Sequence, residues 1–248
     1  MVRLSVSGPA LEVQGDSLLM DDKPVACTRR KLSEMREVLL DSSVADGPDS
    51  SRDVYLMFRS VIPSDAAQLF KEHSIRFDIT LIHDMNLGAE CNKTFGHYHP
   101  EAEQGLGFPE VYAVIDGSAT FIMQKRLEDS DFDVQVVQAK AGDVVLMPPN
   151  YGHVTVNSGK GRLILANLVS SVFKSDYESI ARMHGAAVYI LANGVQAING
   201  RYKKFCITHL DSPPRVQALI GLNSANIYDK FVENPGRFAF LNRPNLLV

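Results

Sequence analysis

Two histidines separated by one residue, His97 and His99, are the sharpest chemical feature of this 248-residue chain. Residues i and i+2 of a strand project from the same face, so both imidazoles can converge on one ion. Glu110 and His153 follow downstream as a carboxylate and a third imidazole. Such a set suits a divalent ion with open positions, whereas closed zinc sites more often recruit thiolates. We therefore predict a mononuclear metal site that acts on a small oxygen-rich molecule.

These four residues lie in a part of the chain that is dominated by predicted strands. From Arg76 onward, short runs of Val, Ile, Thr and aromatic residues alternate with Gly, Pro, Asn or Asp. The predicted strands cover residues 77–81, 110–115, 120–124, 134–138, 143–147, 153–156 and 163–169. Many short strands with turn signals between them favour an antiparallel sandwich or barrel over βαβ units. We predict an all-β fold with a few peripheral helices.

Two extensions are expected to flank this barrel. Residues 1–50 form an N-terminal extension, with short strands at 4–6 and 11–13 and a helix at 31–40. A surface loop is expected at residues 41–52. Residues 51–195 form the barrel, which includes a helix after Pro63 and a short helix at 176–184. Residues 196–248 form a C-terminal extension, with a strand at 204–208 and a final helix that Ser224 caps and Pro235 ends.

The overall composition excludes several classes of protein. Hydrophobic residues make up 45% and charged residues 22% of the chain, which is ordinary for a globular protein. The net charge is -4 without a basic stripe, which argues against a nucleic-acid partner. Three widely spaced cysteines support neither a disulfide framework nor a thiolate zinc site. No apolar run is long enough for a signal peptide core or a membrane span, so we expect a cytoplasmic protein.

The chemistry-bearing residues sit within two longer motifs. Gly117 follows Glu110, and the run 142–148 leads into Gly152-His153 and then Asn157. Together with His-x-His, these resemble the two motifs of the cupin family. The resemblance implies a double-stranded β-helix, or jelly-roll barrel, with His97, His99, Glu110 and His153 as metal ligands. The gap from His99 to Glu110 is longer than in most cupins, so the insert 100–109 either loops out or displaces Glu110.

A narrower resemblance covers roughly residues 50–195. The strings that carry it are Thr94-Phe95-Gly96-His97-Tyr98-His99-Pro100, Pro109-Glu110-Val111-Tyr112 and Tyr151-Gly152-His153-Val154-Thr155-Val156-Asn157, with Asp78-Ile79-Thr80 upstream and Asp176-Tyr177 and His184-Gly185 downstream. They are similar to the cupin-type glucose-6-phosphate isomerases of archaea and some bacteria. The resemblance implies interconversion of glucose 6-phosphate and fructose 6-phosphate by a homodimer. One divalent metal per chain is expected, with Fe or Mn ahead of Zn or Ni.

The same resemblance implies roles for individual residues. Glu110 is the expected base that moves a proton through a cis-enediol, unless the hydrogen moves as a hydride. Tyr112 and His184 are the other catalytic candidates. The expected substrate-binding residues are Thr80, Thr94, the backbone N–H of Gly96 and Tyr177 around the phosphate, and Tyr112 and Tyr151 around the sugar.

Two other functions remain open at this point. A cupin dioxygenase would use the same three histidines and glutamate to hold iron, and iron-dependent oxygen consumption would reveal it. A non-catalytic sugar-phosphate or metal sensor would keep the barrel without turnover. The proposed phosphate pocket argues against the dioxygenase, and conversion of a bound sugar phosphate would argue against the sensor.

Overall fold

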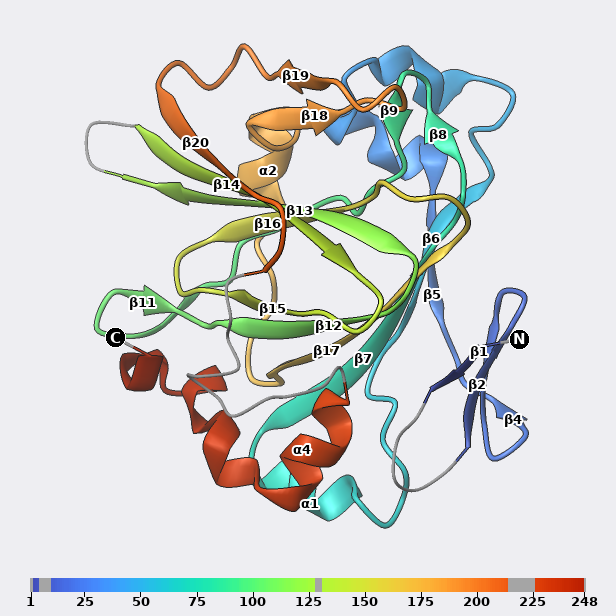
Figure 1. Cartoon of the computed structure of the whole chain (residues 1–248), viewed down its shortest axis with the longest axis vertical. Helices are drawn as coiled ribbons and strands as arrows, with labels where there is room; N and C mark the ends of the chain where they lie inside the picture. Colours follow the sequence, from blue (N-terminus) through green and yellow to red (C-terminus); the bar gives the residue numbers. More distant parts are fainter. Residues whose placement is uncertain (1, 5–9, 128–130, 214–225, 248) are drawn as a thin grey trace.

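The computed structural model describes residues 2–4, 10–127, 131–213 and 226–247, and its centre is a β-barrel made of two sheets (Figure 1). The six-stranded sheet runs in the order β15 (Val144–Met147), β12 (Glu110–Asp116), β17 (Leu163–Ser170), β7 (Ile75–Ile82), β6 (Asp53–Phe58) and β5 (Thr28–Lys31). The four-stranded sheet runs in the order β16 (Gly152–Asn157), β13 (Ser118–Arg126), β14 (Phe132–Lys140) and β20 (Phe205–Leu210). Between β12 and β17 the chain passes repeatedly from one sheet to the other, with β12, β15 and β17 in the larger sheet and β13, β14 and β16 in the smaller, as in the double-stranded β-helix of cupins.

All seven strands predicted between residues 77 and 169 are confirmed, as β7 and β12 to β17. Two barrel strands were missed. β6 was not recognised because its buried run of Val, Tyr, Leu, Met and Phe lacks the alternation of a half-exposed strand. β5 lies in the segment expected to be an extension, yet it pairs with β6 at the edge of the six-stranded sheet. The barrel therefore begins before residue 51.

Successive side chains along each strand point alternately into the barrel and toward its outer surface. On β12, the side chains of Glu110, Tyr112 and Val114 point inward, while Val111 packs outside with a different apolar cluster. The outer cluster lies between the six-stranded sheet and a layer of helices. These are α1 (Ala67–Glu72), α4 (Ile227–Glu233) and the 3-10 helix η4 (Pro235–Leu241), which lie together at the bottom of Figure 1. The C-terminal extension thus covers one face of the barrel.

The remaining elements are short. The N-terminal sheet contains β1 (Val2–Leu4), β2 (Leu11–Gln14), β3 (Ser17–Met20) and β4 (Lys23–Pro24). Two 3-10 helices follow, η1 (Leu32–Val38) and η2 (Ser42–Asp46), and the barrel carries β8 (Asn86–Leu87), β9 (Glu90–Cys91), α2 (Glu178–Arg182), β18 (Val188–Ile190) and β19 (Gln196–Ile198). The chain ends in the 3-10 helix η5 (Pro244–Leu247). Among the described residues, no helix has the length and apolar character needed to cross a membrane.

Local predictions in the extensions need three corrections. The expected helix at 31–40 is a 3-10 helix, although its inward residues Leu32 and Met35 are buried as the periodicity indicated. Part of the expected loop near residue 45 is the short helix η2. The last helix starts after Asn226, whose side chain accepts a hydrogen bond from the Asp229 N–H; the predicted cap Ser224 lies outside the described residues.

The insert between the first-motif histidines and Glu110 folds as a hairpin. Its strands are β10 (Glu101–Glu103) and β11 (Leu106–Gly107), which pair with each other and leave the barrel sheets intact. Asn150 tethers the hairpin, because its side chain accepts a hydrogen bond from the Gly107 N–H at 2.6 Å. The insert therefore loops out, and Glu110 keeps its place as the first residue of β12.

Candidate metal centre

His97, His99, Glu110 and His153 are brought together inside the barrel. One potential ligand atom from each lies within 4.8 Å of all the others. Glu110 starts β12 of one sheet, and His153 lies on β16 of the other. The His-x-His segment joins them because His97 forms an antiparallel bridge to His153, with backbone N–O distances of 3.2 and 3.0 Å. The strand-like spacing that predicted a shared face therefore holds, although the segment is only bridged to β16.

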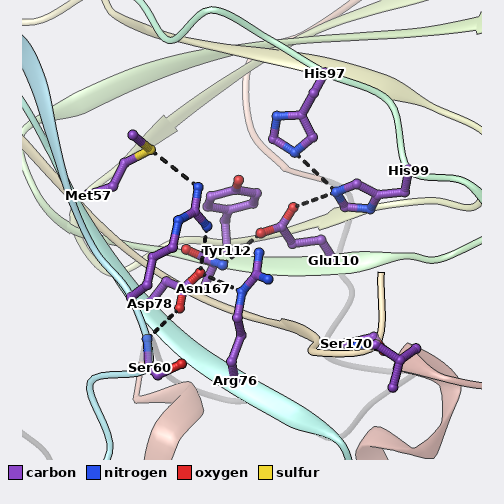
Figure 2. Close-up of polar contacts among 12 residues, drawn as sticks. Met57, Ser60, Arg76, Asp78, His97, His99, Glu110, Tyr112, Asn167 and Ser170 are labelled. Carbon is purple, nitrogen blue, oxygen red and sulfur yellow. Dashed lines mark hydrogen bonds and ion pairs between the residues drawn. The ribbon is translucent and has the colours of Figure 1, made fainter. Parts of the chain in front are cut away.

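The distances within this cluster fit a single divalent ion. The Nε2 atoms of His97 and His99 are 3.1 Å apart, and Oε2 of Glu110 lies 3.4 Å from Nε2 of His99 (Figure 2). The same Oε2 atom is 3.3 Å from Nε2 of His153. Neighbouring ligands that are each about 2.1 Å from one ion stand about 3.0–3.4 Å apart. Oε2 of Glu110 is also buried without a hydrogen-bond partner among the described residues, as expected of an atom that faces a cation.

Second contacts orient two of these ligands. Nδ1 of His99 lies 2.8 Å from the carbonyl oxygen of Phe108, so the N–H donates there and leaves Nε2 as the free lone pair. The Asn167 side-chain amide donates to Oε1 of Glu110 at 2.7 Å, which turns Oε2 toward the histidines (Figure 2). Sequence reasoning missed Asn167. Its inward position on β17, paired with Tyr112, is the signal that could have found it.

Burial sets the protonation states around the cluster. Burial, together with the neighbouring imidazoles of His153 and His99, holds the pKa of His97 well below its usual range. Burial also lowers the pKa of His99 to about 4, although the Glu110 carboxylate opposes the shift. For Glu110, burial alone would raise the pKa, but the adjacent rings of His153 and His99 more than offset this effect and lower the pKa overall. Neutral imidazoles and an ionised carboxylate are the forms that bind metal.

A cavity next to the cluster contains most of the predicted site residues. Of these, its lining includes Thr80, Thr94, Gly96, His97, Glu110, Tyr112, His153 and Tyr177. Tyr112 faces the metal cluster, with its hydroxyl 3.3 Å from Nε2 of His153. Burial and the nearby Glu110 carboxylate raise the pKa of Tyr112 well above its usual value, so its hydroxyl stays protonated. Gly96 adopts a φ of +84°, and a Cβ there would lie 2.4 Å from a methyl group of Val154.

Two predicted substrate or catalytic residues do not line this cavity. The Tyr151 hydroxyl hydrogen-bonds to Asp133 on β14, and Gln135 donates to it at 3.2 Å. His184 lies just after α2 with a φ of +53°, and its carbonyl oxygen accepts a hydrogen bond from the Tyr189 hydroxyl. The structure therefore brings neither side chain to the metal cluster. The positions of Tyr151 and His184 follow from local turns and hydrogen bonds that the motif spacing does not encode.

The cavity also contains charged residues that the sequence did not suggest. Arg59, Arg76 and Asp78 line it, and both arginines bind the same Asp78 oxygen. Arg76 and Asp78 precede Thr80 by four and two residues on β7, so all three share the inward face. That spacing was a usable signal, but an arginine beside an aspartate on a strand more often indicates a solvent-exposed pair. The net positive charge of this group bears on how an anionic substrate could be held.

Comparison with known proteins settles the family. The family model described as "Glucose-6-phosphate isomerase (GPI)" matches residues 29–206, which is more than half of the chain. The chain belongs to the glucose-6-phosphate isomerase family. It is 25% identical over 170 residues to a "Glucose-6-phosphate isomerase" of Thermococcus litoralis, covering 66% of this chain and 80% of the relative. The match to a protein of the same name from Pyrococcus abyssi is 26% over 176 residues, covering 70% and 87%.

The isomerase family membership confirms the narrower resemblance and makes this chain an isomerase of that class. The matched region starts within β5, which agrees with the finding that this strand belongs to the barrel. A cupin 2 conserved barrel domain protein from Rhodopseudomonas palustris gives a TM-score of 0.33 at 9% identity, covering 49% of this chain and 63% of that structure. The fold assignment therefore rests on the strand order of the isomerase itself.

Proposed function

We propose that this protein interconverts glucose 6-phosphate and fructose 6-phosphate at a divalent metal held by His97, His99, Glu110 and His153. The observation that carries the proposal is the convergence of these four ligand atoms beside a cavity that is lined by the predicted phosphate residues. The family membership and the names of the relatives support the reaction. A bound divalent ion supplies Lewis-acid polarisation of the sugar carbonyl, and Fe or Mn is the expected metal, ahead of Zn or Ni.

Three residues of the chain have separate roles in the reaction. Glu110 removes the proton from C2 of the open-chain aldose and returns it to C1 through a cis-enediol, while O1 gains a proton and O2 loses one. Asn167 holds Oε1 of Glu110, which fixes the plane in which the carboxylate can accept the proton. The Tyr112 hydroxyl, kept protonated by burial, donates a hydrogen bond toward the oxygens at the reacting carbons.

The low pKa of Glu110 makes it a weak base, because the surrounding donors stabilise its ionised form. Two routes for the hydrogen therefore stay in competition. In one, Glu110 carries a proton despite its low basicity, helped by short distances and by the polarised carbonyl. In the other, the hydrogen passes directly between the carbons as a hydride. Both routes use the same metal ligands and phosphate pocket.

At the phosphate end we propose Thr80, Thr94, the Gly96 N–H and Tyr177 as donors to the phosphate oxygens. Because glycine has no Cβ, residue 96 adopts a positive φ without strain, and its backbone N–H can approach a ligand closely. Contributions of Tyr151 and His184, a homodimeric assembly and a cytoplasmic location remain predictions from the family resemblance.

A coupled isomerase assay on metal-reconstituted protein tests the proposal. We expect activity in the parent, and a loss of about a hundredfold or more in Glu110→Gln, because the base is removed. Running the reaction in deuterated water separates the routes: deuterium at the reacting carbon supports proton transfer, and its absence supports the hydride. An inactive parent that is folded and metal-loaded contradicts the proposal.

A further inference from the structure

The wall of the cavity opposite the histidines carries a charged group with a surplus of positive charge. Nε of Arg76 lies 2.8 Å from the Oδ2 atom of Asp78 (Figure 2). Nη1 of Arg59 lies 3.2 Å from the same oxygen. The other carboxylate oxygen of Asp78 accepts a hydrogen bond from the Ser60 N–H at 2.8 Å. Asp78 is 4% exposed, so both of its oxygens are committed to fixed donors. Two guanidinium groups then share one carboxylate, which leaves about one net positive charge beside the substrate space.

Arg59 is directed toward the proposed phosphate end of the cavity. Its Nη2 atom lies 3.4 Å from Sδ of Met57, and Met57 is the cross-strand partner of Thr80. The guanidinium of Arg59 interacts electrostatically with Tyr177 at that end, and also with Tyr112 and Glu110 beside the metal cluster. The Arg59 side chain is 42% exposed against 20% for Arg76, which places Arg59 nearer the opening. Arg76 instead lies toward Glu110, as Figure 2 shows.

The other donors at that end carry no charge. Within the described part of the chain, the Thr80 hydroxyl and the Gly96 N–H have no protein hydrogen-bond partner, so both are available to a ligand. Moving a phosphate dianion from water to neutral donors alone carries a large desolvation cost. A guanidinium offsets that cost and matches phosphate geometry with parallel N–H groups. Nη2 of Arg59 is free for this contact, because its thioether neighbour is only a weak acceptor.

We propose that Arg59 is the cation that binds the substrate phosphate, and that Asp78 positions it by holding its Nη1 group. The inference rests on the proposed function for the presence of a phosphorylated sugar, and it adds a charged residue to a pocket of neutral donors. Asp78 does not touch the substrate. Its carboxylate offsets the repulsion between the two guanidinium groups that share it and holds Arg59 toward the phosphate.

Affinity for sorbitol 6-phosphate, an open-chain analogue that cannot isomerise, tests the role of Arg59 without turnover. Titration calorimetry on metal-loaded protein should show affinity about tenfold to a hundredfold weaker in Arg59→Gln, the range expected for a lost charge-assisted hydrogen bond. Arg59→Lys should recover part of the loss. Arg52→Gln is the matched control, since Arg52 pairs with Asp49 on the surface with a side chain 57% exposed. It removes the same charge and should bind as the parent does.

The positioning role of Asp78 is tested by comparing the effect of its substitution in two backgrounds, because a general structural role would weaken binding equally in both. Asp78→Asn should weaken sorbitol 6-phosphate binding in the parent background but add little to the loss already present in Arg59→Gln, because positioning matters only while the guanidinium is there. Additive losses in the two backgrounds would contradict the positioning role. If Asp78→Asn does not fold, the Arg59 variants alone decide the proposal.

The outcomes separate this inference from the isomerase proposal. Binding by the parent that weakens in Arg59→Gln supports Arg59 as the phosphate ligand even if no isomerisation is detected, in which case only the isomerase proposal fails. Equal affinity in the parent and Arg59→Gln overturns the inference, as does a parent that does not distinguish sorbitol 6-phosphate from sorbitol.

Discussion

The two ends of the barrel interior are built from the same strands but differ in chemistry. At one end, inward positions of β12, β17 and β7 carry Glu110, Asn167 and Asp78. Farther along β17 and β7, at the other end, the inward positions are apolar, with Leu163 paired to Ile82. Because β12 and β17 pair antiparallel, the polar inward side chains of one strand lie beside those of the other, and the apolar inward side chains do the same. The barrel is therefore a stabilising core at one end and a reactive cavity at the other, and mutations should separate these two functions.

The largest loss of activity should follow from a substitution at the polar end of the barrel. His153→Ala removes one imidazole from the metal cluster and leaves Glu110 without one of its neighbours. We expect metal to be lost on dialysis and isomerase activity to fall about a thousandfold, because ligand and Lewis acid are lost together. Metal content by atomic absorption and coupled assays measure the two effects. His209→Ala, at an exposed histidine on β20, is the control and should keep both. Metal retention in His153→Ala would contradict the assigned ligand set.

A substitution at the apolar end should lower the stability of the protein and leave its activity unchanged. Leu163→Ala removes a fully buried side chain and should lower the free energy of unfolding by about 2–5 kcal/mol, while activity per folded molecule stays near the parent value. Urea denaturation followed by fluorescence or circular dichroism measures the loss. Leu127→Ala, at a position 45% exposed, should cost less than about 0.5 kcal/mol. A collapse of kcat in folded Leu163→Ala would show that the two ends are not independent.

A smaller effect is expected at Asn167, which supports the site without being a predicted ligand. Asn167→Leu keeps a similar volume but removes the amide that donates to Oε1 of Glu110. We expect kcat/KM to fall about tenfold, the lower end of the range for residues that orient metal ligands. Asn167→Gln should recover part of the activity. An unchanged kcat/KM in Asn167→Leu would mean that the orientation of Glu110 does not depend on this contact.

The smallest effect should be a pH-dependent stability of the metal-free protein. The pKa of His99 is lowered to about 4, below the unfolded value of about 6.5, so between these values the unfolded state binds more protons. The stabilising contribution is therefore complete above about pH 6.5 and is lost as the pH falls toward 4. Thermal unfolding in the presence of a chelator should show this decline. His99→Asn should make the decline shallower, with the remainder coming from His97, whose pKa is also lowered. An equally steep decline in that variant would assign it to other groups.

Strand prediction succeeded where the sequence alternates or is bounded by turn residues, and failed where it does not. The strands from β12 to β17 were all expected, and four of the five segments that separate them contain glycine or asparagine. β6 is continuously apolar, so periodicity could not distinguish it from a core helix or loop. The insert before Glu110 could be judged only once its hairpin was seen, because sequence length does not indicate whether a loop folds outward.

The sequence by itself determined the four candidate ligands, because spacing and motif order identify residues that share a strand face or follow a particular turn. It also determined the family resemblance, which the family match confirmed. Only the tertiary structure decided that Arg59, Arg76 and Asn167 join this site, since cross-strand register brings them together across large sequence separations. It also placed Tyr151 and His184 away from the cavity. Contacts between strands depend on register and closure of the barrel, and neither is written in the local pattern of residues.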